Sequence, residues 1–426
     1  MKTKNVVLVS AFLITSATFG QKEQIKAAEK SLKGGNPQEA ITILQSADSL
    51  IANATDSEKA QFFFIKGNAL LNLANKKVDE TQNFSAAAKV FNNLLVIEKA
   101  SGKDKYSAQA QTAITDIKAK LVNFAIDKQA EKKFKEASDL LFQVYELDKK
   151  DLSKLYFAAT YAMYDKEYDT ALNFYEELKK QNYSGEEIQY FAKNAITEKE
   201  DYFGSNATAK SDRDSKVKLK LYSEPREEKI PSKRGEIYKR IAFILSEKGK
   251  ILEAKVAFTE AKKENPEDVS IIISEAELYF KEKDVETYKK LLNVALEKNP
   301  NNVELIFNLG VVSHNNKDLV EAEKLYSKAI SIDPNYNLAY LNLANLKLDN
   351  RNLIVEQMNK LGTSTIDTKK YDALKKQSEN ILLKDVLPLL EKANQLDATN
   401  EDTKTLLLRI YGALDMTDKA KALKGK

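Results

Sequence analysis

Apolar and small residues recur along this chain at the spacing of amphipathic helices, and in its middle part the whole pattern repeats. Three helical segments are each followed by a proline, and Pro266, Pro300 and Pro334 are equally spaced along the chain. An alanine lies five residues before each of these prolines. Because the residue before a proline is pushed out of the α conformation, each proline is expected to end a helix. The pattern therefore predicts a helical repeat with a constant period of roughly 34 residues.

The helix that precedes each proline carries small residues where a neighbouring helix would meet it. Ala254 and Ala322 lie twelve residues before the first and third prolines, and an aromatic residue follows each four positions later, at Phe258 and Tyr326. Alanine lets a second helix approach closely, and the ring fills the space beside it. A polar turn such as residues 315–318 precedes this helix. Each unit is thus predicted as two amphipathic helices joined by a short turn.

This pattern resembles the tetratricopeptide repeat family, and residues 303–336 resemble it most. Leu309 and Gly310 match the close-packing pair of the family's first helix. Ile306 stands where the family often has Trp, and Ser313 where it often has Tyr.

The resemblance loosens toward both ends of the chain, but the register is kept. Ala137 is repeated one period later by Ala171, and Gly67 followed by Ala87 and Phe91 is typical of a unit with a lengthened turn. About eight or nine units span most of the chain. The resemblance implies an all-α fold, an α-solenoid of stacked helix-turn-helix repeats, with two arrays separated by a linker.

Breaks in the repeat predict the domain organisation. The predicted segments are a signal peptide at 1–20, an N-terminal repeat array at 21–199, a linker or insertion at 200–232, a central array at 233–348, a helical insertion at 349–384 and C-terminal repeat units at 385–426.

The first twenty residues have the three parts of a secretory signal peptide. Lys2 and Lys4 form a basic start, Val6 to Ile14 is apolar except for Ser10, and small residues lead to Gly20. The apolar run is too short for the roughly 20 residues of a spanning helix. We expect cleavage after Gly20 and a periplasmic mature chain without a membrane span.

The segment 200–232 interrupts the repeat with Gly, Ser, Asn and two prolines, which indicates a loop or linker. Within it Val217, Leu219 and Leu221 alternate with lysines. Two interpretations follow: a basic linker lying on the solenoid, or an exposed strand that pairs with the edge of a partner's sheet.

The segment 349–384 is predicted as a short helix from Leu353 to Leu361, a turn, and a long helix from Thr368 that Pro388 kinks or restarts. The stretches 371–374, 387–393 and 411–418 resemble exported repeat proteins of Gram-negative bacteria that have no established activity.

The amino-acid composition excludes several kinds of catalytic and metal-binding site. The 426 residues include no Cys and one His, which excludes disulfides, thiol nucleophiles and Cys-based or multi-His metal sites. The net charge of +4 argues against a nucleic-acid partner. No phosphate-binding loop is present, so we expect no enzyme activity and no cofactor.

In the repeat family the first helices line a concave face, and side chains opposite the core stripe point into it. Arg240, Ser274, Asn308 and Asn342 form a polar line there, each one repeat period after the last. The candidate binding residues are Arg240, Phe243, Ser274, Phe280, Asn308, Val311, His314, Asn342 and Asn345. An amide both donates to C=O and accepts from N–H, which suits a peptide backbone. The alternative is a solvated face without a ligand.

These features predict an exported protein–protein interaction module or scaffold of the cell envelope, which binds a protein or peptide segment on the concave face. The alternative is a periplasmic chaperone or assembly factor for outer-membrane or secreted proteins. The sequence leaves the oligomeric state open.

Overall fold

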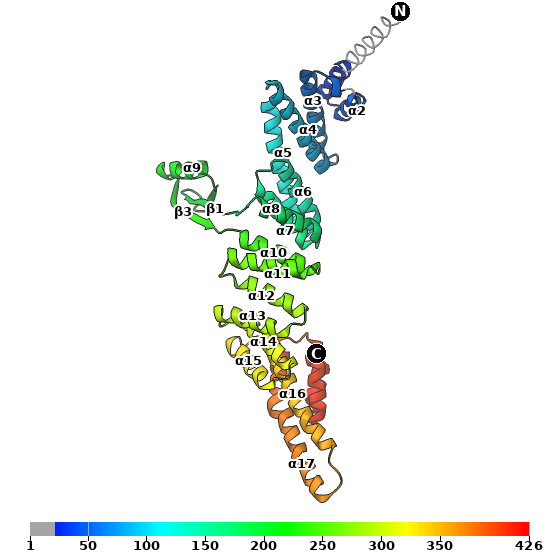
Figure 1. Ribbon diagram of the computed structural model, residues 1–426, viewed down its shortest axis with the longest axis vertical. Coiled ribbons are helices and arrows are strands. Elements are labelled where there is room, and N and C mark those ends of the chain that lie inside the picture. Colours follow the sequence, from blue (N-terminus) through cyan, green and yellow to red (C-terminus); the bar gives the residue numbers. More distant parts are fainter. Residues whose placement is uncertain (1–21, 50, 426) are drawn as a thin grey trace, which may run out of the picture. The chain divides into compact units, whose positions relative to one another are not determined.

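The computed structural model describes residues 22–49 and 51–425. Most elements are helices that follow one another as antiparallel pairs (Figure 1), which confirms the predicted α-solenoid. The chain divides into two compact units, and the boundary falls within α10 (Arg234–Glu247): unit 1 ends at Ile244 and unit 2 begins at Leu245. The boundary between the units therefore does not fall in the segment 200–232. The other predicted boundaries remain predictions.

Unit 1 begins with helical residues 22–33 and contains four helical pairs before the insertion. Its elements are α2 (Pro37–Ala47), a short 3-10 turn (Ile51–Asn53), α3 (Asp56–Asn75), α4 (Glu80–Ser101), α5 (Ser107–Ala130), α6 (Phe134–Leu147), α7 (Leu152–Tyr164) and α8 (Tyr168–Lys180). Ala137 and Ala171, the small residues predicted one period apart, are fully buried in second helices, and so is Ala40 in α2.

Unit 2 repeats with the period that the prolines predict. Its elements are α11 (Ile251–Glu264), α12 (Val269–Lys281), α13 (Val285–Lys298), α14 (Val303–Asn315), α15 (Leu319–Ile332), α16 (Asn337–Asn359), α17 (Thr365–Asn380), α18 (Leu387–Leu396), α19 (Glu401–Ala413) and α20 (Thr417–Lys424). The helices α11, α13 and α15 each end two residues before a proline, at Pro266, Pro300 and Pro334.

The turns inside the helical pairs share one backbone conformation. Gly249, Lys283 and Lys317 have left-handed φ angles of 72°, 63° and 66° and follow one another at the spacing of the prolines. Lys132 and Lys166 have φ angles of 59° and 62° and are separated by the same interval. Only glycine adopts this conformation without steric cost, so the lysines are held there by the hairpin geometry.

The turn after α14 shows what the left-handed residue accomplishes. The N–H of Lys317 donates to the carbonyl of His314 at 3.0 Å, and the N–H of Asp318 donates to the carbonyl of Ser313 at 2.9 Å. These two bonds satisfy carbonyls that the end of a helix leaves without partners. Asp318 then caps the next helix, because its carboxylate accepts from the N–H of Glu321.

A glycine and an aromatic ring close the pair α3–α4. A methyl group on Gly67 would lie 2.6 Å from the ring of Phe91, so only glycine fits there. The prediction of a lengthened turn in this unit is wrong, because residues 76–79 form a short turn. The extra residues lie in the two helices, which are 20 and 22 residues long.

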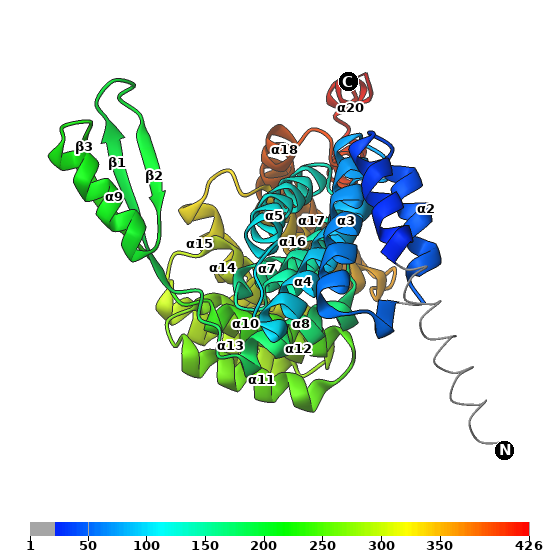
Figure 2. The same ribbon diagram turned by 90° about the horizontal axis from the view of Figure 1, so that it is seen from above.

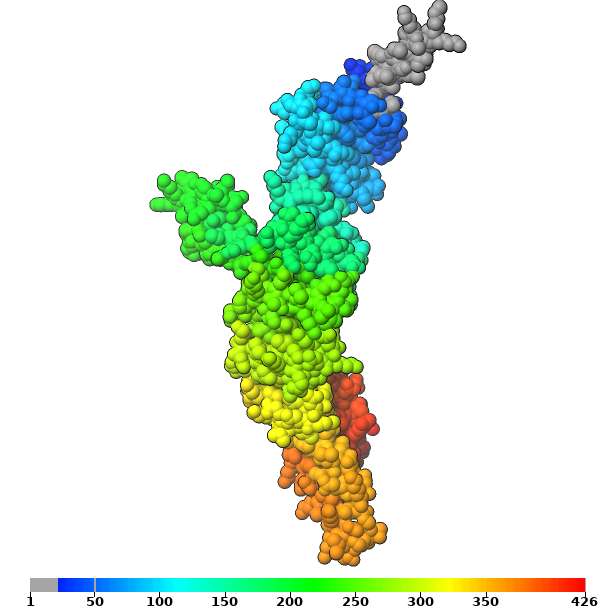
Figure 3. Space-filling model, viewed as in Figure 1, coloured from blue at the N-terminus to red at the C-terminus, as the bar shows by residue number. Residues whose placement is uncertain are grey.

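The segment predicted as a loop or linker is a folded insert that starts before residue 200. It consists of β1 (Glu187–Asn194), β2 (Glu200–Gly204), α9 (Ala207–Lys218) and β3 (Tyr222–Ile230). The strands form an antiparallel sheet in the order β2-β1-β3, and α9 contacts all three (Figure 2). In the space-filling view the insert is a lobe of its own (Figure 3). The predicted exposed strand at 217–221 is wrong, because Val217 lies in α9.

A buried arginine holds the insert together. The side chain of Arg213 on α9 is 5% exposed and lies 5.0 Å above the ring of Tyr190 on β1. It donates to Glu227 at 3.2 Å and to the carbonyl of Arg226 at 3.1 Å, both on β3. The insert therefore has a small core of its own that is built on one cation.

The helices on either side of the insert contact each other. The hydroxyl of Tyr156 on α7 donates to Glu236 on α10 at 2.8 Å, and the ring of Tyr168 on α8 meets Phe243 edge to face at 6.3 Å. In unit 1 the helix packing thus continues from α8 to α10, and the insert projects from the chain between these two helices.

The segment 349–384 differs in detail from its prediction. The predicted short helix from Leu353 to Leu361 is the last part of the long helix α16. The following helix runs from Thr365 through a π-helical segment (Ile381–Val386) into α18. Pro388 is the second residue of α18, which fits its missing N–H, because a proline cannot bond to the carbonyl four residues before it.

The predicted signal peptide at 1–20 lies outside the described residues. In the described part of the chain, no helix has both the length and the apolar character needed to cross a membrane.

Candidate protein-binding site

A cavity of about 300 Å³ opens on the face formed by the first helices of unit 1. Its lining comes from residues 22–33, from α3 and from Tyr106 at the start of α5, which are the first helices of three successive pairs. The lining residues are Glu29, Leu32, Lys33, Gln61, Phe64, Ile65, Asn68, Asn72 and Tyr106. No residue of a second helix contributes to this lining, so the cavity belongs to the inner face of the helical pairs.

The wall of this cavity combines aromatic and amide groups. The rings of Phe64 and Tyr106 stack at 4.3 Å with an interplanar angle of 18°. Asn68 and Asn72 follow Phe64 at helical spacing, and each donates one amide N–H to the carbonyl four residues earlier, at 2.8 and 2.9 Å. Each amide retains a second N–H and its carbonyl oxygen for a ligand.

Charged groups lie at the rim of the same cavity. Glu29 accepts from Lys33 at 2.6 Å and from the amide of Gln61 at 2.8 Å. The hydrogen bond from Lys33 is the main cause that lowers the pKa of Glu29. The carboxylate is therefore ionised at neutral pH and neighbours a cation, so the rim can receive groups of either charge.

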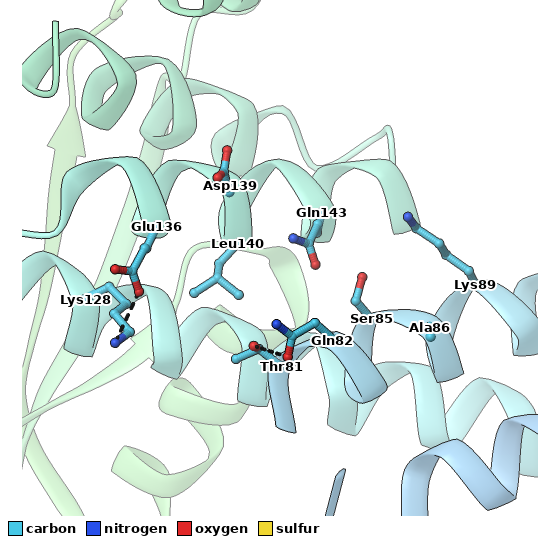
Figure 4. A pocket seen from close by; sticks show the side chains of 10 residues that line it. All are labelled: Thr81, Gln82, Ser85, Ala86, Lys89, Lys128, Glu136, Asp139, Leu140 and Gln143. Atoms are coloured by element: carbon cyan, nitrogen blue, oxygen red, sulfur yellow. Dashed lines mark hydrogen bonds and ion pairs between the residues drawn. The ribbon is translucent and has the colours of Figure 1, made fainter. Parts of the chain in front are cut away.

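A second cavity, of about 530 Å³, is lined mainly by residues of the second helices α4 and α6 (Figure 4). Residues of α4 and α6 face each other across it, and Lys128 at the end of α5 pairs with Glu136 at 3.3 Å. Burial raises the pKa of Asp139, which lines this cavity. Apart from Ala86 and Leu140 its lining is polar or charged, and it has no aromatic surface to hold an apolar side chain.

Two of the nine predicted binding residues lie in unit 1 and contact neighbouring helices. Arg240 pairs with Glu236 at 2.7 Å, and its side chain is 18% exposed. Its guanidinium also donates to the sulfur of Met163 at 3.4 Å. Phe243 packs against Tyr168, as described above. Both side chains take part in the packing of α10 on α7 and α8.

The other seven lie on three first helices of unit 2. Ser274 and Phe280 are on α12, Asn308, Val311 and His314 on α14, and Asn342 and Asn345 on α16. All are half-buried except Phe280, which is 56% exposed and lies 5.0 Å from the ring of Tyr288.

His314 is the predicted residue with the clearest contacts. It lies in the last turn of α14, where its Nε2 is 3.2 Å from a carboxylate oxygen of Asp349 on α16. Its Nδ1 is 3.4 Å from the hydroxyl of Tyr326 on α15. One imidazole thus joins three consecutive helices. Asn342 donates to the carbonyl of Leu338 at 2.9 Å within its own helix.

A comparison with protein families identifies the architecture. Residues 291–324 match the tetratricopeptide repeat model. This match covers α14 and the adjoining parts of α13 and α15. The chain therefore contains a tetratricopeptide repeat at these residues.

Tetratricopeptide repeat structures also appear among the solved structures similar to this chain. YrrB, described as a TPR protein with an unusual peptide-binding site, is 16% identical, with 51% of this chain and 88% of that chain covered and a TM-score of 0.31. The C-terminal part of a TPR repeat-containing protein from Cytophaga hutchinsonii is 12% identical, with 66% and 97% covered and a TM-score of 0.38. Residues 41 to the end of MamA from Desulfovibrio magneticus RS-1 are 15% identical, with 45% and 91% covered and a TM-score of 0.32.

No curated protein sequence matches the chain. Among residues 22–49 and 51–425, no cluster of three His, Cys, Asp or Glu side chains is arranged to hold a metal ion. The tetratricopeptide repeat fold supports a role as a protein–protein interaction module.

Sequence reasoning missed the cavity at Phe64. The central prolines define the repeat register, and the long helices α3 and α4 do not follow it. A signal was nevertheless present, because Phe64, Asn68 and Asn72 lie at intervals of four residues and share one face of a helix.

Proposed function

We propose that this tetratricopeptide repeat protein is an exported interaction module of the cell envelope, which binds a segment of a protein partner on the face of its first helices. The observation that carries the proposal is the cavity lined only by first-helix residues, with an aromatic stack and a row of amides. Protein segments offer both groups that such a site recognises, a regularly spaced polar backbone and apolar side chains.

The chemistry of recognition follows from the lining. The remaining N–H and C=O groups of Asn68 and Asn72 pair with a peptide carbonyl and a peptide N–H. The stacked rings of Phe64 and Tyr106 offer an apolar surface for one side chain of the ligand. The Glu29–Lys33 pair at the rim favours a polar or charged residue next to it.

The predicted residues of unit 2 belong to the same proposal. Asn308, Asn342 and Asn345 lie on first helices, and the proposal extends to them as binding residues of unit 2. Val311 also lies on a first helix, but it packs against the core cluster of Ile306 and Tyr326. For Arg240 and Phe243 the binding role remains a prediction, because both side chains already contact α7 and α8.

The location in the proposal rests on the amino terminus. Two lysines, an apolar run and small residues ending at Gly20 are the pattern of a cleaved export signal. In the cell envelope of a Gram-negative bacterium this places the mature chain in the periplasm.

A photo-crosslinking experiment tests the proposed face. A photoreactive amino acid replaces Asn72 on the first-helix face or Gln82 on the opposite face, both of which are exposed in unit 1. We expect a discrete crosslinked partner in the cell envelope from position 72 and little or none from position 82. Equal crosslinking from both positions would contradict the assignment of the face.

Variants separate the two parts of the site. Asn68→Ala with Asn72→Ala removes the amides of the cavity, and Asn308→Ala with Asn342→Ala removes those of unit 2. The matched control is Gln82→Ala with Gln143→Ala in the second cavity. We expect the control to keep the partner, while loss of a hydrogen-bonding amide pair weakens binding by about 1–3 kcal/mol. A chaperone would instead retain a broad set of clients in every variant.

A further inference from the structure

The insert ends in an exposed apolar tip that the binding face does not use. The fractional exposure of Ile196 is 90%, of Leu219 69% and of Leu221 53%. They come from two separate turns, which the hydrogen bond from the N–H of Ala195 to the carbonyl of Leu221 holds together at 3.0 Å. We call residues 195–199 and 218–221 the tip.

The tip is the free end of the insert. Where the chain enters and leaves the sheet, Glu187 on β1 pairs with Ile230 on β3. At the other end of the same ladder, Asn194 pairs with Tyr222, and the tip follows directly (Figure 2). The apolar side chains therefore lie a full strand length away from the attachment of the insert, where they contribute nothing to packing it on the helices.

The charge around these side chains is mainly positive. Lys199, Lys218 and Lys220 lie between or beside the three apolar residues, and Glu198 is the one acidic residue of the tip. All three lysines are exposed. Lysine carries its charge on a long apolar stem, so its ammonium reaches outward past neighbouring aliphatic groups.

Strand addition by a protein partner at the edge strand β3 does not explain the tip. Pro225 lies in the outer strand β3, together with the charged residues Glu224, Arg226 and Glu228. Proline and charge on an edge strand are the features that block pairing with another strand. The apolar groups are gathered beyond the end of the strands, at the projecting end of the insert.

We propose that the tip docks on an anionic membrane surface, with Ile196, Leu219 and Leu221 entering the headgroup region and the three lysines contacting lipid phosphates. A projecting tip of aliphatic and basic side chains suits a fluid anionic surface, which needs no complementary shape. This docking is independent of the binding face and holds the chain at a membrane without a spanning helix.

Fluorescence tests the proposal directly, because the chain contains no Trp. Leu219→Trp places a single indole at the tip, and Leu252→Trp places one at an equally open position of unit 2, where Leu252 is 80% exposed. The proteins begin at Gln21 and are mixed with vesicles of phosphatidylcholine alone or with phosphatidylglycerol. A blue shift of the Leu219→Trp emission with anionic vesicles, and none for Leu252→Trp, supports docking by the tip. An unchanged Leu219→Trp emission overturns it.

Co-sedimentation with the same vesicles separates the two contributions. Ile196→Ser, Leu219→Ser and Leu221→Ser together should lower binding at least about tenfold, and Lys199→Gln, Lys218→Gln and Lys220→Gln should abolish the preference for anionic lipid. The control changes Leu252, Val256 and Val320 to Ser, at exposed positions in unit 2. Equal loss in this control, or failure of the unaltered chain to bind, overturns the proposal. Self-association through the tip, seen as a concentration-dependent dimer that the serine variant lacks, also overturns it.

Discussion

The ring of Tyr326 on α15 lies against the backbone of Gly310 on α14, so that a methyl group at Gly310 would be 2.8 Å from the ring. Tyr326 is fully buried, and its ring also lies 5.8 Å from that of Phe307. The absence of one side chain thus creates the space for another. Gly67 and Phe91 repeat the arrangement in unit 1.

Gly310→Ala should therefore destabilise unit 2 by about 1–3 kcal/mol, because the added methyl group forces the ring out of its packing. Urea unfolding followed by circular dichroism measures the change. Gly412→Ala is the control: it also lies in a helix, nothing is within 4 Å of its added methyl, and it should be neutral or stabilising. Equal destabilisation by both changes would show that the close contact is absent.

Lys317→Gly should stabilise the chain by about 1 kcal/mol, because a lysine at a φ angle of 66° carries a steric cost that glycine does not. The same measurement applies. Lys324→Gly, at an exposed position inside α15, should lower stability by about 1 kcal/mol. The opposite signs of these two substitutions are the test, and matching signs would rule out the left-handed turn.

Arg240→Met should destabilise unit 1 by about 2–3 kcal/mol, because it leaves the largely buried carboxylate of Glu236 without its cation. Lys26→Met removes a cation from an exposed pair with Glu23 in the same unit and should cost less than about 0.5 kcal/mol. If Arg240→Met and Lys26→Met unfold at the same urea concentration, Arg240 does not stabilise the packing of α10. That result would favour its predicted role in binding.

The same pair gives unit 1 a pH dependence. Burial raises the pKa of Glu236, but the hydrogen bonds from Arg240 and Tyr156 more than offset it and hold the pKa below its ordinary value of 4.5. This stabilisation is present above pH 4.5 and is lost as the pH falls through the lower pKa of the folded state. The stability difference between the unaltered chain and Arg240→Met should therefore shrink as the pH is lowered below about 4.5.

Arg213→Leu should unfold the insert while the helical repeats stay intact. It removes the buried guanidinium together with its contacts to Glu227, to the carbonyl of Arg226 and to the ring of Tyr190, at an expected cost of about 1.5–3 kcal/mol, a large loss for so small an insert. Limited proteolysis should then cut within residues 187–230. Lys218→Leu, which removes an exposed cation from the end of the same helix, is the control and should leave the insert resistant.

Export should depend on the apolar run near the amino terminus. Expressed in a Gram-negative host, the chain should be recovered from the periplasm with Gln21 as its first residue. Leu8→Asp with Phe12→Asp should leave it uncleaved in the cytoplasm, because the signal requires an uninterrupted apolar run. Gln24→Asp, beyond the cleavage site, should be processed normally. Processing of the double variant would refute the signal peptide.

The repeat itself was readable from the sequence because its constraints are local. A proline ends a helix wherever it stands, and small residues at helical spacing mark a close contact whichever partner fills it. The positions of Ala254, Tyr326 and Pro334 therefore predicted buried faces and helix ends that the structure confirms.

The insert could not be predicted in this way. Its core depends on the contacts of Arg213 with Glu227 and Tyr190, which lie on other elements of the insert. Because Arg213 stands in a polar stretch, the sequence pattern predicts an exposed side chain there. The alternation of lysines with Val217, Leu219 and Leu221 is compatible with a strand, one of the two interpretations, yet contacts of α9 with all three strands of the sheet hold residues 216–218 in a helix.

The sequence by itself thus determined the repeat, its period and the small and aromatic residues of its seam, because each follows from the geometry of a single helix and its nearest neighbour. Only the tertiary structure decided which polar residues face a cavity and which are taken up in packing. The repeat pattern predicts Arg240, and not Asn68, as a binding residue. In the structure Asn68 lines an open cavity, whereas Arg240 pairs with Glu236. The physical reason is that the availability of a polar side chain depends on partners contributed by other helices, and their distance is set only when the helices pack.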